Sequence, residues 1–172
     1  LYDLAPYGLP DEPSVGDSVR AGADLVLFSG DKLLGGPQCG IIVGRAAIVE
    51  RLRTNPLARA VRVDKLTLAA LQGTLEIHRS ARAFTEVPVL AQLTTAADCI
   101  QARVARFLEQ LQAQSGSPGA YSQQAVASAS GGGALPEITM PSWAVAIASL
   151  NPDDVSRRLR LGNPAVLSRV KD

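Results

Sequence analysis

Residues 28–44 read FSGDKLLGGPQCGIIVG and place one lysine, Lys32, between two apolar segments. The preceding residues 23–28 form a short, nearly continuous apolar run, which predicts a strand buried on both faces of a parallel sheet. The glycines and proline of residues 35–37 predict a turn, and residues 39–44 predict a second buried strand. Lys32 is therefore expected at the exit of a strand, where the active-site residues of open α/β sheets gather.

A lysine at a strand exit has three chemical interpretations. If it is desolvated, its amine is partly neutral and can form a Schiff base with an aldehyde, which is the chemistry of pyridoxal phosphate. Alternatively, its stem packs against the sheet while the amine reaches solvent. A phosphate-binding glycine loop fits less well, because residues 30–32 lack the glycine spacing and the Lys-Ser/Thr pair of a P-loop.

Asp31 adjoins the lysine and has two interpretations of its own. It is either a catalytic group, donating a proton or orienting the amine, or a turn aspartate that accepts hydrogen bonds from nearby backbone N–H groups. Local pattern leaves both open.

Residues 28–44 closely resemble the cofactor-lysine segment of the bacterial selenocysteine synthase (L-seryl-tRNA(Sec) selenium transferase) family. The resemblance continues through residues 55–71, NPLARAVRVDKLTLAAL, resumes at residues 131–136, GGGALP, and covers most of the chain. One departure is Cys39, where the family usually carries alanine. The resemblance implies an α/β fold: the end of a fold-type-I pyridoxal phosphate-dependent large domain (residues 1–85), followed by a small α+β domain (residues 86–172).

The same resemblance implies roles for individual residues. Lys32 would hold pyridoxal phosphate and, once displaced by substrate, move the α-proton. Arg59 and Arg62 match the family's anion-binding arginines, which would hold selenophosphate or its phosphate product. Their spacing of three would put both guanidinium groups on one side of a helical turn, and two planar forks suit a phosphate-type anion.

The implied reaction is the conversion of seryl-tRNA(Sec) to selenocysteinyl-tRNA(Sec), with selenophosphate as the selenium donor. The family also implies a homo-oligomer built from dimers, in the form of a ring-shaped decamer. The groups that hold the cofactor ring and phosphate, and the domain that holds most of the tRNA, are expected before Leu1. The chain is therefore expected to be a fragment that binds pyridoxal phosphate weakly or not at all and has no transferase activity alone.

Two rival functions fit the lysine segment. One is a pyridoxal phosphate-dependent lyase or aminotransferase that acts on a small amino acid and uses no tRNA. The other is a catalytically silent fragment whose apolar helix and sheet serve oligomer contacts.

Composition limits these functions only broadly. The 172 residues are 47% apolar, enough for a real core, and the formal net charge of +1 excludes a surface that attracts nucleic acid everywhere. Cys39 and Cys99 lack metal-ligand spacing and are expected to be reduced, buried thiols of a cytoplasmic protein, with no metal site. No apolar run approaches the roughly 20 residues that span a bilayer, so no membrane partner is expected.

Periodicity and capping residues predict the remaining elements. The single histidine, His78, is expected to lie at a helix end rather than to act as a catalytic base. The glycines of residues 131–133 are expected to form a bend or a bulge between strands rather than a phosphate site. Expected helices cover residues 14–21, 45–54, 64–80 (apolar nearly all round and buried), 94–115 and 153–161; expected strands cover residues 121–130, 137–140, 142–150 and 165–170.

Overall fold

The structure is a computed structural model that describes residues 4–9, 14–115, 119–131 and 138–170. The chain forms two compact units, Leu1–Thr95 with Ala129–Thr139, and Ala96–Ser128 with Met140–Asp172. Both units mix helices and strands, which agrees with the expected α/β class. The division of the intact protein into a large and a small domain near residue 86 stays a prediction.

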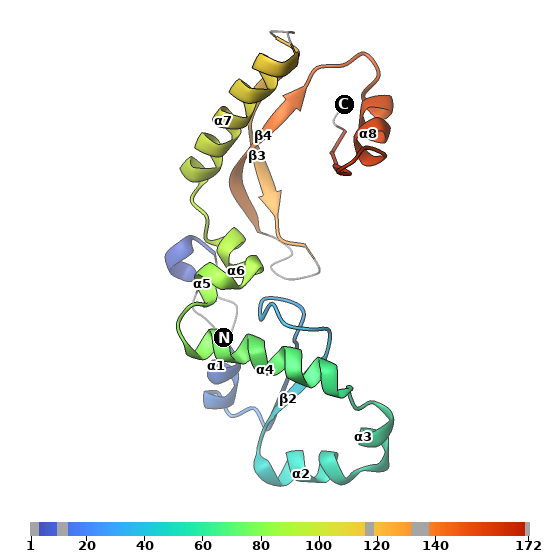
Figure 1. Ribbon diagram of the computed structural model, residues 1–172. Helices are drawn as coiled ribbons and strands as arrows, with labels where there is room; N and C mark the ends of the chain where they lie inside the picture. Colours follow the sequence, from blue (N-terminus) through green and yellow to red (C-terminus); the bar gives the residue numbers. More distant parts are fainter. Residues whose placement is uncertain (1–3, 10–13, 116–118, 132–137, 171–172) are drawn as a thin grey trace. The chain divides into compact units, whose positions relative to one another are not determined.

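The first unit is mostly helical (Figure 1). Side-chain caps fix several of its helix starts. Ser14 and Asp17 form a reciprocal capping box at the start of α1, and the Asp64 carboxylate accepts a hydrogen bond from the Thr67 N–H at the start of α4. These caps confirm the predicted starts of both helices. The elements of this unit are η1 (Ala5–Tyr7), α1 (Val15–Arg20), β1 (Leu25–Ser29), β2 (Gly40–Gly44), α2 (Ala46–Thr54), α3 (Pro56–Ala60), α4 (Lys65–Arg79), α5 (Ala83–Glu86) and α6 (Pro88–Leu93).

β1 and β2 pair with each other in antiparallel register, from Leu25 opposite Gly44 to Ser29 opposite Gly40. The prediction of strands buried on both faces of a parallel sheet is therefore wrong for this pair as the structure describes it. A parallel return needs a crossover of about a dozen residues or more, whereas residues 30–39 are enough only for an antiparallel return. The faces of the pair are only partly covered: Leu27 is 67% exposed, whereas the other residues of β1 are half-buried.

The core of the first unit gathers around the short helices α5 and α6. Ala83, Val87 and Leu90 are almost completely buried and form one cluster. Pro88 begins α6, a position where its missing N–H costs no helical hydrogen bond. The ring of Phe84 stacks on that of Tyr7, with centroids 5.3 Å apart, so η1 lies against this cluster.

α4 is less covered than its sequence predicts. No residue of this helix, all of which the structure describes, is buried, and Leu66 is 83% exposed. The prediction of a buried helix is therefore wrong for this chain. A helix that is apolar nearly all round needs neighbours on every side; among the described residues, α5 and the loop of residues 30–39 contact α4.

The second unit contains α7 (Ala97–Ser115), most of the hairpin β3 (Tyr121–Ala129) and β4 (Thr139–Ile147), and α8 (Pro152–Arg160). The hairpin strands run in opposite directions (Figure 1) and pair with each other. The side-chain amide of Gln123 on β3 donates a hydrogen bond of 3.1 Å to the carbonyl oxygen of Gln101 on α7. α7 therefore runs beside the hairpin.

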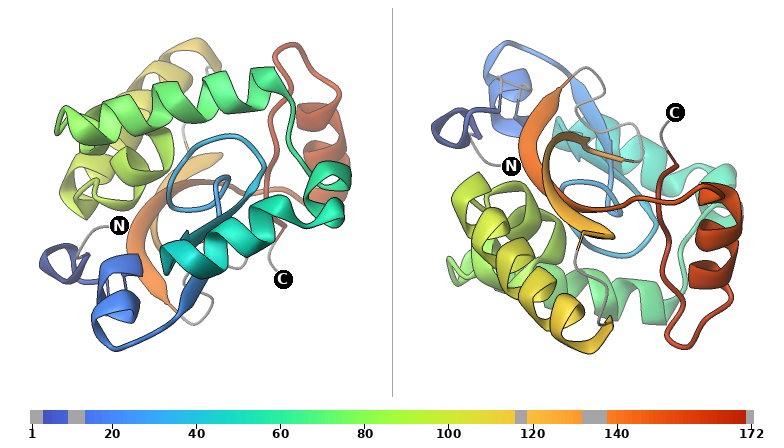
Figure 2. Two further views of the ribbon diagram at one scale, coloured as in Figure 1. Left: turned by 90° about the horizontal axis from the view of Figure 1, so that it is seen from below. Right: turned by 90° about the horizontal axis from the view of Figure 1, so that it is seen from above.

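Two strand predictions in the second unit need correction. The strands expected at residues 137–140 and 142–150 are one strand, β4, although residue 137 lies outside the described residues. Pro141 lies within β4, which is tolerated because a strand of a two-stranded ribbon has one edge without a partner. Residues 165–170 form no strand; the N–H of Val166 instead donates to the carbonyl oxygen of Leu159, so this segment returns beside α8 (Figure 2).

Both cysteines are free thiols in the structure. Cys39 immediately precedes β2 and is half-buried, whereas Cys99 on α7 is exposed. The prediction of a buried thiol is therefore wrong for Cys99. Among the described residues α7 buries Leu108 instead.

No helix of the described part of the chain is long and apolar enough to cross a membrane.

Candidate functional site

The loop of residues 30–39, which we call the Lys32 loop, is closed by backbone hydrogen bonds. The N–H of Gly30 donates to the carbonyl oxygen of Cys39 at 2.8 Å, which continues the pairing of β1 with β2. The N–H of Gly35 donates to the carbonyl oxygen of Lys32, and that of Gly36 to the carbonyl oxygen of Gly30, both at 2.8 Å. Gly35 has a φ of 70°, in the left-handed region that favours glycine. The glycines thus form a fixed turn with Lys32 at its start.

Lys32 and Asp31 form an ion pair at this turn. The Nζ of Lys32 lies 3.2 Å from each carboxylate oxygen of Asp31. The side chains are 42% and 31% exposed, so solvent reaches the amine and the condition of a desolvated lysine is not met in this chain. Asp31 is expected either to act on the amine or to accept hydrogen bonds from nearby backbone N–H groups. In the structure its carboxylate contacts the amine.

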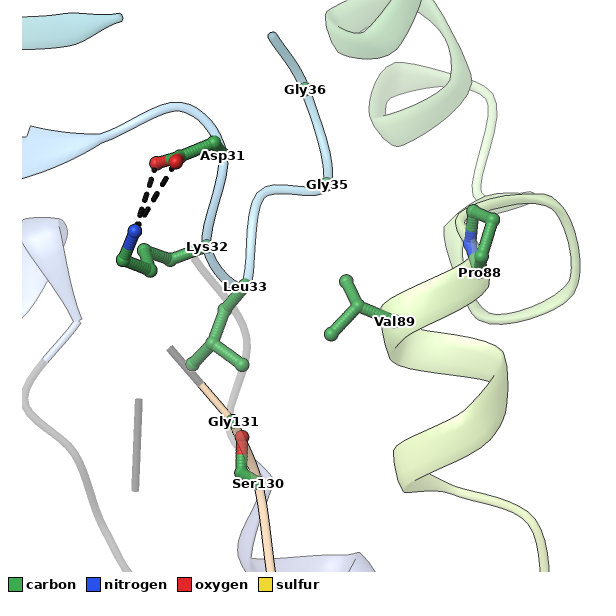
Figure 3. A pocket seen from close by; sticks show the side chains of 9 residues that line it. All are labelled: Asp31, Lys32, Leu33, Gly35, Gly36, Pro88, Val89, Ser130 and Gly131. Carbon is green, nitrogen blue, oxygen red and sulfur yellow. Dashed lines mark hydrogen bonds and ion pairs between the residues drawn. The ribbon is translucent and has the colours of Figure 1, made fainter. Parts of the chain in front are cut away.

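The pair faces an open pocket of about 530 Å³ within the first unit (Figure 3). Three segments line it: the Lys32 loop, the start of α6 and the residues that follow β3. A concave site with apolar walls and a few polar groups is typical of small-molecule binding. The lining residues are Asp31, Lys32, Leu33, Gly35, Gly36, Pro88, Val89, Ser130 and Gly131.

Sequence reasoning missed Pro88, Val89 and Ser130 as pocket residues. They are distant from Lys32 along the chain, and no local pattern connects them to it. Gly131 does form the expected bend, and it also lines the pocket. The next two glycines of the predicted run, 132 and 133, lie outside the described residues.

Arg59 and Arg62 lie on the α3 side of this unit, and neither is among the described residues that line the pocket. α3 ends at Ala60 with Val61 as its C-cap, so Arg59 is helical and Arg62 follows the helix. The expectation that one helical turn holds both arginines is therefore wrong. Both side chains are exposed, and within the described ranges neither has an ion-pair partner.

The carboxylates with displaced pKa values belong to helices rather than to the pocket. Hydrogen bonds from Ser14 lower the pKa of Asp17, and the hydrogen bond from the Thr67 N–H lowers the pKa of Asp64. The hydrogen bond from Arg53 likewise lowers the pKa of Glu50. Asp17 and Asp64 cap helix starts and Glu50 pairs with Arg53 within α2, so Lys32 and Asp31 remain the charged pair of the candidate site.

Comparison with known proteins assigns the family. A family model described as SelA, L-seryl-tRNA selenium transferase, matches residues 1–172. Proteins named L-seryl-tRNA(Sec) selenium transferase from Hyphomonas neptunium, Geobacter sulfurreducens and Solidesulfovibrio magneticus are 44%, 43% and 45% identical to the chain. The alignments cover 99–100% of this chain and 37–38% of each relative, so the chain spans little more than a third of their length. The chain belongs to the L-seryl-tRNA selenium transferase family.

Proposed function

We propose that this chain is the lysine-bearing, C-terminal part of a pyridoxal phosphate-dependent enzyme that converts seryl-tRNA(Sec) to selenocysteinyl-tRNA(Sec). One observation carries the proposal: a chain of this family places a lysine amine, paired with a carboxylate, on an open pocket. The names of the relatives supply the substrate, L-seryl-tRNA(Sec), and the transferred element, selenium. Resemblance to the family adds three further parts to the proposal: selenophosphate as the donor, the fold-type-I arrangement and a decameric ring of dimers.

The residues of the pocket fit the cofactor chemically. Pyridoxal phosphate is held through its aldehyde by a primary amine, and Lys32 provides the one primary amine among the described lining residues. The volume of about 530 Å³ lies within the usual range for cofactor pockets, about 300–1,000 Å³. When bound, the cofactor withdraws electrons from the α-carbon of the seryl group and thereby makes its α-proton acidic.

The chain's own residues have distinct tasks in this proposal. Lys32 would hold the cofactor, and its amine, when released, would accept and return the α-proton of the substrate. Asp31 accepts a hydrogen bond from that amine at 3.2 Å and so fixes its direction. Leu33 and Val89 contribute apolar side chains to the lining of the pocket.

Arg59 and Arg62 would bind the anionic selenium donor or the phosphate that it leaves. Their guanidinium groups are exposed and have no described acidic partner, so both are available to an anion. Neither arginine is among the described residues that line the Lys32 pocket in this chain.

The test is chemical mapping of the cofactor lysine in the full-length protein that contains this chain. The protein is loaded with pyridoxal phosphate, reduced with borohydride, digested, and analysed by mass spectrometry. We expect the adduct on Lys32, its loss in Lys32→Ala, and its retention in Lys65→Ala, a control at the exposed start of α4. An adduct on another lysine in the parent protein would refute the assignment.

A further inference from the structure

The Lys32 loop is held from the side opposite to its reactive residues. Within residues 31–36, Leu34 is the only residue that does not line the pocket, and it is 2% exposed. Its carbonyl oxygen lies 2.8 Å from the Nε2 of His78 on α4. A carbonyl oxygen only accepts hydrogen bonds, so Nε2 carries the proton and His78 is the donor.

A second residue of α4 contacts the same loop. Thr74 lies one helical turn before His78, so the two side chains share a face of the helix. That face reaches Gly36, because a Cβ placed on this glycine would lie 3.4 Å from the Oγ1 of Thr74. α4 therefore supports the loop at two points, by packing at Gly36 and by a hydrogen bond at Leu34.

We propose that His78 is a positioning residue, which fixes the Lys32 loop through the carbonyl group of Leu34 and thereby sets the place of the Lys32 amine. The backbone hydrogen bonds from Gly35 to Lys32 and from Gly36 to Gly30 lie on both sides of Leu34 in the same turn. Loss of the His78 contact leaves a buried carbonyl group without its donor, and the turn must open to let water reach it. Movement of Leu34 therefore moves Lys32, two residues earlier. The role of Lys32 in this inference rests on the proposed function, whereas the contact that holds its loop does not.

The test compares two substitutions in the full-length protein, without cofactor, by hydrogen exchange. His78→Leu removes the donor and keeps an apolar side chain, whereas His78→Gln restores an amide N–H at nearly the place of Nε2. Arg79→Ala, at the next, exposed position of the same helix end, is the control. We expect the amides of Gly35 and Gly36 to exchange about tenfold faster or more in His78→Leu, the effect of losing one buried hydrogen bond. The glutamine variant and the control should keep the parental rates, and amides within α7 should not change in any variant.

The cofactor provides the second readout. Pyridoxal phosphate added to the same proteins should be retained less in His78→Leu than in the parent, with retention recovered in His78→Gln. If the leucine variant does not fold, His78→Asn replaces it, because its shorter amide cannot reach the place of Nε2. Parental exchange at Gly35 and Gly36 in the donor-free variant, or equal loss in the leucine and glutamine variants, would overturn the inference. If the parent protein takes up no pyridoxal phosphate on Lys32, the proposed function fails, and the exchange rates still decide the role of His78.

Discussion

Substitution of Gly30 by alanine should disturb the Lys32 loop. Gly30 is buried at the end of β1, where its N–H donates to Cys39 and its carbonyl oxygen accepts from Gly36. A Cβ at this position would lie 2.5 Å from the Sγ of Cys39 and 2.7 Å from the carbonyl oxygen of Pro37. Both distances are far below ordinary contact, and the carbonyl group belongs to the backbone of the loop itself. The loop must therefore shift.

Overpacking of this kind costs about 1–3 kcal/mol of unfolding free energy. Two matched controls add the same methyl group where space is open: Gly40→Ala at the start of β2, and Gly73→Ala within α4, each with no atom within 4 Å of the new Cβ. The helical control should gain about 0.5–1 kcal/mol, because alanine is the better helix former. Urea titration of the full-length proteins, followed by circular dichroism, should therefore rank Gly30→Ala below the parent and Gly73→Ala above it, with equal m-values.

The cause of the loss can be checked by a double substitution. Cys39→Ala removes the Sγ atom and should recover part of the stability lost in Gly30→Ala, while the contact with the Pro37 carbonyl oxygen remains. Residues in direct contact are expected to show such non-additive effects. If Gly30→Ala is as stable as the parent, or if Cys39→Ala recovers nothing, the packing argument for the Lys32 loop is refuted.

Three further predictions concern the anion site, the core and the helix caps. Arg59→Ala and Arg62→Ala should each weaken use of selenophosphate by about tenfold or more, the effect of losing a charged hydrogen bond, with unchanged cofactor uptake; rates at the parental level across donor concentrations would exclude both arginines. Leu90→Ala should lower the unfolding free energy by about 2–5 kcal/mol in the same urea titration, since Leu90 is 1% exposed; a loss below about 1 kcal/mol would contradict its place in the core. Asp17→Asn should destabilise the protein near neutral pH. The difference in unfolding free energy between parent and variant should shrink as pH falls through and below 3.8, because a carboxylate with a lowered pKa stabilises the fold only while it is ionised. A difference that is constant with pH would contradict the capping box.

The features that the sequence predicts well are those with local physical causes. Asp64 caps α4, as its position before an apolar-periodic segment predicts, and Asn151, which the sequence offers beside Asp153 as the cap of the last helix, caps α8. Gly35 and Gly36 form the predicted turn after Lys32 because the left-handed φ of Gly35 is a local property of the chain. Each of these signals operates within a few residues, so no knowledge of the tertiary structure is needed to interpret it.

Burial and strand partners are different, because they depend on what lies beside an element. The apolar runs of β1 and β2 predict strands correctly, but apolarity alone does not distinguish an antiparallel pair from two strands of a parallel sheet. Leu66 and Leu27 show the same limit, since their exposure depends on the neighbours that this chain provides. The chain spans little more than a third of its relatives' length.

The candidate site combines both kinds of feature. The position of Lys32 at a strand exit follows from local sequence, and its contact with Asp31 follows from adjacency. The contact between His78 and Leu34 joins residues 44 positions apart, so no spacing rule within one element predicts it. The spacing of Arg59 and Arg62 is misleading for another reason: it would place both residues on one side of a helix, but α3 ends at Ala60. An anion site at these arginines therefore depends on how the backbone leaves α3 after Val61, and substitutions that alter this exit, rather than the helix, are the ones that should change the distance between the two guanidinium groups.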